Sequence, residues 1–173
     1  MKNSKTRRVA LLGMLFALAM VLSFLESTLT PLLGLPPGVK LGLANIVVMY
    51  AMLCLGSGDA LVLVVLKSLF GLLTRGATAG LLSLCGGVLS WAVMLVLCLA
   101  GQKKEYFILS VSGAIAHNMG QLVGLKLFTA SKYTWYYAPV LLVSGLAMGA
   151  VTALSLKAVL PALEKLGLSQ KNK

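Results

Sequence analysis

The chain has 173 residues, of which 59% are hydrophobic and 11% are charged, with a formal net charge of +11 and a mean hydropathy of +0.96. Soluble domains carry about 25% charged residues, so this composition excludes an ordinary soluble enzyme and predicts a protein that folds in lipid. Nucleic acid is not an expected partner, because the basic residues are spread over the ends of apolar stretches rather than gathered on one surface.

Six apolar stretches approach the roughly 20 residues that a helix needs to cross the hydrocarbon core. They are too long and too continuously apolar for the strands of a membrane barrel, which alternate over about 10 residues. The sequence therefore predicts an all-α, polytopic membrane protein, with residues 1–173 forming a single transmembrane domain. The expected helices span residues 9–25, 41–55, 60–73, 79–99, 106–128 and 135–160.

The first stretch follows a basic segment, residues 2–8, which is also how a secretory signal peptide begins. Residues 24–26 offer no small-residue cleavage site, so we expect a retained first helix. With this helix entering from inside, most basic residues lie on the cytoplasmic side, against Lys40, Arg75 and Lys132 outside. We therefore expect a multi-pass protein of the cell membrane with both termini in the cytoplasm.

Two connections carry structural signals. The turn between the second and third stretches contains Ser57 and Asp59, either of which can cap the following helix, so these short stretches are expected to form a hairpin. The connection over residues 35–42 is rich in proline, and it is either a simple connector or a lid over a cavity on the outer face. Its neighbours Lys40 and Asn45 favour the lid.

Polar residues inside or beside the apolar stretches are the candidate site, since an ionisable group within a membrane is costly and marks a functional position. Cations outnumber acids in the outer half of the predicted bundle. This excess predicts an acidic small-molecule substrate: a small carboxylate, a phosphorylated vitamin-like cofactor, or a quinone or isoprenoid precursor. The candidate substrate-binding residues are Glu26, Lys40, Asn45, Lys67, Arg75, His117, Asn118 and Gln121.

Two of these residues leave alternatives open. Lys67 lies about 12 Å into the membrane, where it snorkels outward, pairs with Glu26, or meets the anionic group of a ligand. His117 shares a helix face with Gln121 and is either an interhelical hydrogen-bond partner or part of a cavity lining. The chain has one histidine, whereas a structural zinc site needs about four Cys or His ligands. Neither a metal nor another cofactor is expected.

Small residues at four-residue spacing let membrane helices approach one another closely. The sets are Gly13 with Ala17, Gly120 with Gly124, and Gly145 with Gly149 and Ala153. They serve either to pack helices within the chain or to dock the helices of a partner. Gly13 and Ala17 are the candidate docking residues, because the cytoplasmic end of the first helix is also strongly basic.

Several catalytic patterns are missing from the sequence. It has no G-x-x-x-x-G-K-[ST] phosphate-binding loop. Its single aspartate, Asp59, lies at a turn on the cytoplasmic side, which excludes a Ser-His-Asp triad, and no paired carboxylates are placed to hold magnesium. A transporter without its own motor fits these features better than an enzyme does.

Three segments carry a resemblance to a known family: residues 37–45 (PGVKLGLAN), 82–90 (LSLCGGVLS) and 116–121 (AHNMGQ). The whole chain resembles the small membrane family labelled Gx transporter, or heptaprenyl diphosphate synthase component I. That family is similar to the substrate-binding S components of energy-coupling factor transporters, which have six helices and both termini in the cytoplasm.

The resemblance implies a chain that captures a small molecule on the outer side and docks on a transmembrane coupling subunit driven by two ATPases. S components commonly dock through an alanine-xxx-alanine pattern on the first helix, which Gly13 and Ala17 match only approximately. The family's other label implies a rival function, a membrane-bound accessory subunit of a prenyl synthase that makes the menaquinone side chain. Prenyl synthases hold magnesium through aspartate-rich motifs, so a chain with one aspartate would be non-catalytic. A transporter needs a polar cavity open to the outside, whereas a prenyl accessory needs an apolar groove.

Overall fold

The computed structural model of the chain describes residues 2–32, 42–102, 105–129, 136 and 138–165. These residues contain no strand, and they form six helices in the order expected from the sequence. The helices are α1 (Lys2–Leu32), α2 (Leu43–Cys54), α3 (Ser57–Arg75), α4 (Ala77–Leu99), α5 (Tyr106–Thr129) and α6 (Ala138–Lys165). The predicted all-α fold is confirmed.

The bounds of the helices differ from the prediction mainly at α1 and at the turn before α3. α1 runs seven residues beyond the predicted 9–25 at each end, because hydropathy marks the segment that fits the hydrocarbon core and not the whole helix. The expected cap by Ser57 or Asp59 is wrong. Gly56, at φ 126°, precedes α3, and no side chain caps the helix. Ser57 is already helical, and Asp59 accepts a hydrogen bond from Arg8 instead.

Four helical segments are long and apolar enough to cross a membrane, which supports a helical membrane protein. They are Thr6–Leu29, Ser57–Arg75, Ala77–Leu99 and Ala138–Ala158. α2 is apolar but has only 12 residues, short of the roughly 20 that span the hydrocarbon core. α5 has the length, with 24 residues, but carries His117, Asn118 and Gln121 in its middle.

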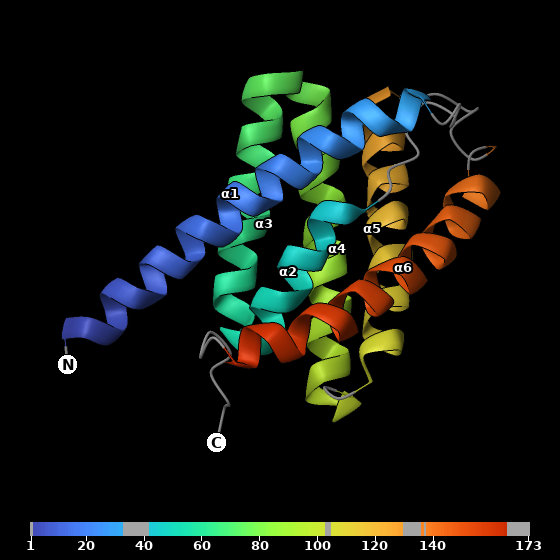
Figure 1. Cartoon of the computed structure of the whole chain (residues 1–173). Coiled ribbons are helices and arrows are strands. Elements are labelled where there is room, and N and C mark those ends of the chain that lie inside the picture. The colour runs from blue at the N-terminus through green and yellow to red at the C-terminus, as the bar shows by residue number, and fades with distance from the viewer. Residues whose placement is uncertain (1, 33–41, 103–104, 130–135, 137, 166–173) are drawn as a thin grey trace.

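The helices form two layers (Figure 1). α3, α4 and α5 stand side by side, and α1 and α6 cross them diagonally with α2 between. Contacts of α2 with α3, of α1 with α3 and of α5 with α6 join the layers. The short α2 is therefore enclosed, and eight of its 12 residues are buried, including Val47, Met49 and Ala51.

Glycines allow α5 to pack closely against α4 and α6. A Cβ atom on Gly120 of α5 would lie 2.6 Å from the carbonyl oxygen of Cys85 and 2.8 Å from the Cα atom of Gly86 on α4. A Cβ atom on Gly149 of α6 would lie 2.6 Å from the Cα atom of Val111 on α5. These contacts confirm the packing role that small residues in the fifth and sixth apolar stretches predict.

Candidate functional site

Polar side chains gather where α1, α2 and α3 meet. Glu26 is 7% exposed, and its Oε1 atom accepts a hydrogen bond from the backbone N–H of Gly42 at 2.7 Å. Gly42 has φ 77° immediately before α2, a left-handed conformation that glycine adopts without steric penalty. The carboxylate on α1 therefore fixes the position at which α2 begins.

Lys67 belongs to the same cluster. It is 6% exposed, and its Nζ atom donates to Oδ1 of Asn45 on α2 at 2.9 Å. Of the three alternatives for Lys67, pairing with Glu26 and contact with a ligand stay predictions. The third, outward snorkelling, does not fit the burial of the side chain in the bundle. The physical reason is that a buried amide oxygen from the neighbouring helix replaces water around the ammonium, which offsets part of its desolvation.

Arg75 lies at the end of α3, with its side chain exposed. One guanidinium nitrogen donates to the hydroxyl of Ser23 on α1 at 3.1 Å. Lys40 lies outside the described residues, as do all of residues 35–41 of the proposed lid. Of the predicted site residues, the structure thus brings Glu26, Asn45, Lys67 and Arg75 to the region between the first three helices.

The polar residues of α5 are buried at helix interfaces. The Nε2 atoms of His117 and Gln121 are 3.1 Å apart, and a Cβ atom on Gly86 of α4 would lie 3.0 Å from the His117 ring. Asn118 donates to the backbone carbonyl of Leu141 on α6 at 2.7 Å. The Asn118 contact joins α5 to α6, whereas the contact between His117 and Gln121 lies within α5, so the interhelical role of His117 stays a prediction. None of the three residues lines either of the cavities described next.

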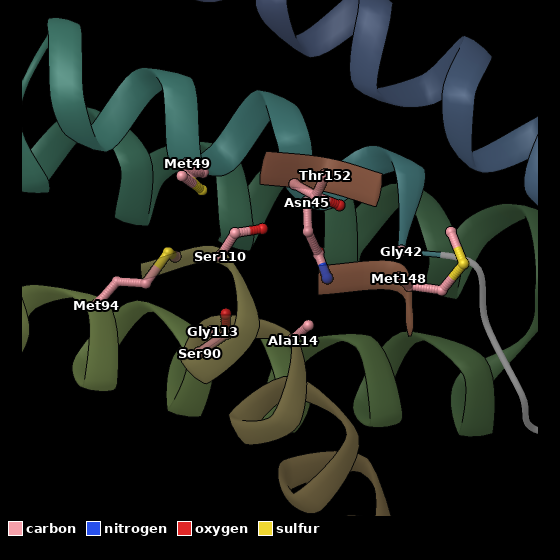
Figure 2. A pocket seen from close by; sticks show the side chains of 10 residues that line it. All are labelled: Gly42, Asn45, Met49, Ser90, Met94, Ser110, Gly113, Ala114, Met148 and Thr152. Carbon is pink, nitrogen blue, oxygen red and sulfur yellow. The ribbon is translucent and has the colours of Figure 1, made fainter. Parts of the chain in front are cut away.

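A small cavity lies between α2, α4, α5 and α6 (Figure 2). Its volume is about 20 Å³, which is room for about one water molecule. Asn45 extends into it from α2, and its lining is otherwise made of small hydroxyl residues, methionines, glycines and one alanine. The lining residues are Gly42, Asn45, Met49, Ser90, Met94, Ser110, Gly113, Ala114, Met148 and Thr152.

A larger groove lies between α1, α2 and α6, with a volume of about 470 Å³. Eight of its ten lining residues are aliphatic or methionine, and the other two are Tyr50 and Ser155. α1 supplies Leu11, Met14, Leu15, Leu18 and Leu22; α2 supplies Ile46, Val47 and Tyr50; α6 supplies Ser155 and Leu156. We call this feature the α1–α2–α6 groove.

Sequence reasoning missed the α1–α2–α6 groove. Its leucines have the composition of any lipid-facing helix surface, so no residue type in it stands out. The one available signal is the spacing of Leu11, Leu15, Leu18 and Leu22, which places them on one face of α1. That spacing does not reveal whether the face meets lipid, another helix or a ligand.

The predicted docking residues lie on the outside of α1. Gly13 and Ala17 are both exposed, and a Cβ atom on Gly13 would meet nothing within 4 Å. This differs from the glycines of α5 and α6, which are occupied by contacts within the chain. Docking through Gly13 and Ala17 stays a prediction.

Metal binding finds no support in the described residues, where no three His, Cys, Asp or Glu side chains come together. Asp59 is engaged with Arg8 at 2.7 Å.

Comparison with known proteins identifies the family. Neither a curated protein nor a solved structure matches the chain. The family model of heptaprenyl diphosphate synthase component I matches residues 15–159 of the 173. This match covers α2 to α5 completely, α1 from Leu15 onward and α6 as far as Val159. The chain belongs to the heptaprenyl diphosphate synthase component I family.

Proposed function

We propose that this chain is the non-catalytic, membrane-embedded accessory component of a heptaprenyl diphosphate synthase, and that it holds the isoprenoid tail in the α1–α2–α6 groove. The observation that carries the proposal is the groove itself. A prenyl accessory needs an extended apolar surface, whereas a small polar substrate needs a polar cavity. The groove has about 470 Å³ and an apolar lining, while the polar cavity has about 20 Å³.

The groove has the size and lining that an isoprenoid tail requires. Small-molecule sites have volumes of roughly 300–1,000 Å³ and mostly apolar linings with a few polar groups. Leu11 and Leu22 are 11 positions apart on α1, which corresponds to about 16 Å of groove length. Flexible methionine such as Met14 adapts to an irregular ligand surface. The groove therefore fits part of a methyl-branched chain.

The energetic benefit depends on where the tail comes from. A tail that grows out of an aqueous catalytic site exposes apolar surface to water at every elongation step. Moving that surface into an apolar groove stabilises it by about 25 cal/mol per Å². A membrane component beside the catalytic protein would thus draw the growing product out of water and into the bilayer.

The chemistry is assigned to a partner protein. The full sequence has one aspartate and three glutamates, and two of these four acids, Glu26 and Asp59, are occupied by Gly42 and Arg8. Prenyl transfer requires magnesium held by clustered aspartates, which a second, aspartate-rich component would supply. We propose a complex in which that component approaches from the cytoplasm, where the basic end of α1 would also place the N-terminus.

The test is competition for the groove by a bulky side chain. Leu18→Trp would fill the groove and should lower labelling of the purified protein by a photoreactive isoprenoid at least about tenfold, a loss of ~1.4 kcal/mol. Val21→Trp on the same helix is the matched control, because Val21 is 56% exposed and does not line the groove. Equal labelling of both variants and the native chain would overturn the proposal.

A second candidate function is that of a substrate-binding S component in an energy-coupling factor transporter, with a small anionic substrate. One observation favours it: Asn45 lines the small cavity (Figure 2) and also accepts a hydrogen bond from buried Lys67 at 2.9 Å. A cation held behind the lining amide would attract an anion. The cavity holds about one water, so such a substrate would have to enter by separating α2 from α6.

A further inference from the structure

We infer that the small cavity between α2, α4, α5 and α6 is the binding site of one ordered water molecule, which joins these four helices inside the membrane bundle. Its partners are the side chains of Asn45, Ser90, Ser110 and Thr152, all of which line the cavity. The site lies on another face of α2 than the α1–α2–α6 groove, which Ile46, Val47 and Tyr50 line. The inference therefore does not rest on the proposed function.

Two buried hydroxyl groups line the cavity without a hydrogen-bond partner among the described residues. Ser90 on α4 is 4% exposed and Thr152 on α6 is 5% exposed. A buried hydroxyl that makes no hydrogen bond costs free energy, and buried polar groups in native proteins are nearly always bonded to protein or to ordered water. The two hydroxyls thus indicate a polar ligand in the cavity.

Asn45 presents a hydrogen-bond donor to the same cavity. Its Oδ1 atom accepts from the Lys67 ammonium at 2.9 Å, and because an ammonium only donates, this contact fixes which end of the amide is the oxygen. The amide nitrogen extends away from α2 into the cavity (Figure 2). The charge of Lys67 polarises the amide and strengthens its N–H donors. The ligand must therefore accept a hydrogen bond.

Ser110 presents an acceptor. Its hydroxyl on α5 donates to the backbone carbonyl of Gly149 on α6 at 2.7 Å, so its proton is used and its remaining lone pairs only accept. This oxygen would repel an anion, whereas the N–H groups of Asn45 and the ammonium of Lys67 behind them would repel a cation. A neutral ligand that both accepts and donates hydrogen bonds suits both sides of the cavity.

The size of the cavity selects water among such ligands. A water needs about 10–15 Å³ of this kind of volume and two to four polar partners, and the cavity offers about 20 Å³ and four partners. Glycine keeps the space open: a Cβ atom on Gly113 would lie 3.3 Å from Oγ of Ser90 and 3.1 Å from Sδ of Met94. A bound water would extend the hydrogen bond between Lys67 and Asn45 to α4, α5 and α6.

The sign of one substitution distinguishes a hydrated cavity from a dry one. Thr152→Val keeps the shape of the side chain and removes its hydroxyl. With a bound water, the variant loses one hydrogen bond, and the equilibrium constant for folding should fall about fivefold, ~1 kcal/mol. With a dry cavity, the variant removes a hydroxyl that had no partner, so the constant should stay the same or rise. Reversible unfolding in a denaturing detergent measures this constant.

Thr74→Val on α3 is the matched control. Thr74 is exposed, and its hydroxyl donates to the carbonyl of Phe70 in its own helix at 2.7 Å, far from any lining residue of the cavity in the sequence. Its folding constant should change by less than about twofold. A constant that is unchanged or raised in Thr152→Val would overturn the inference.

A crystal structure grown from a lipid phase, with bromide in place of chloride and at a resolution that shows ordered waters, tests the ligand itself. The expected result is one oxygen-sized peak within hydrogen-bond distance of the Asn45 nitrogen and of at least two of the three hydroxyls. A cavity without a peak, or an anomalous bromide signal in it, would overturn the inference; the second result would make the cavity an anion site. Neither result affects labelling of the groove, so the proposed function keeps its own test.

Discussion

The interface of α4 with α5 and the surface of α1 both carry glycines, but only the glycines of the α4–α5 interface are in close contact with a neighbouring helix. Between α4 and α5, glycines bring the backbones so close that an added Cβ atom on Gly120 would lie 2.6 Å from a carbonyl oxygen. On α1, Gly13 meets nothing within 4 Å, and the helix leaves a groove of about 470 Å³ beside α2. The closed interface is scaffold, and the open side is where a ligand fits.

The largest expected difference in stability is between two glycine-to-alanine variants, one at the α4–α5 interface and one on the surface of α1. Gly120→Ala should destabilise the protein by about 1–3 kcal/mol, because the new atom overlaps the backbone of Cys85 and Gly86, which cannot rotate away. Gly13→Ala has open space and removes a flexible residue from a helix, so it should be neutral or stabilising by up to ~1 kcal/mol. Thermal unfolding of both variants in detergent measures the difference. Equal midpoints would show that α4 and α5 are not closely packed.

A second effect, of similar size, concerns the contact between α2 and α3 at the junction of the two layers. Asn45→Leu removes the acceptor of the Lys67 ammonium, which remains buried, and should cost about 1.5–3 kcal/mol. Adding Lys67→Met to Asn45→Leu should recover most of this loss, since the polar partner then disappears as well. A double-mutant cycle in the same unfolding assay gives the coupling. Additive losses would mean that the two side chains do not interact.

The smallest expected effect concerns the attachment of α1 to α3. Arg8 is 56% exposed and its partner Asp59 is 8% exposed. Arg8→Gln leaves a buried carboxylate and should cost about 1 kcal/mol, whereas Asp59→Asn leaves an exposed guanidinium and should cost less. The free energy of unfolding of both variants is measured at low and at high salt. The difference between the two losses of stability should be smaller in high salt, because salt screens the charges. The reverse order would place Arg8, not Asp59, in the buried position.

The sequence predicts the helices well because hydropathy and helix length are local properties. All six helices lie where the apolar stretches are. The cost of an isolated buried charge predicts some partner for Lys67, but the sequence analysis did not name Asn45, which the structure shows. The way in which two helices cross depends on contacts between residues far apart in the sequence. The contact between Arg8 and Asp59 joins residues 51 positions apart, and the sequence carries no signal for it.

The α1–α2–α6 groove escapes sequence reasoning for the same physical reason. Its volume depends on how far α1 and α6 stand from the short α2, which no single helix determines. The polar residues drew the prediction toward a cavity, whereas in the structure Asn118 joins α5 to α6 by a hydrogen bond and His117 packs against Gly86 of α4. A polar residue in a membrane helix thus either binds a ligand or holds two helices together, and only its contacts in the structure distinguish these roles.

The most direct test of the account is native mass spectrometry of the protein purified gently from its own membrane, with ligands and partner proteins retained. The account predicts a bound isoprenoid diphosphate together with an aspartate-rich catalytic protein, and it predicts that Leu18→Trp loses the isoprenoid. A small polar anion bound together with a membrane coupling subunit and two ATPases would contradict the account and establish the transporter.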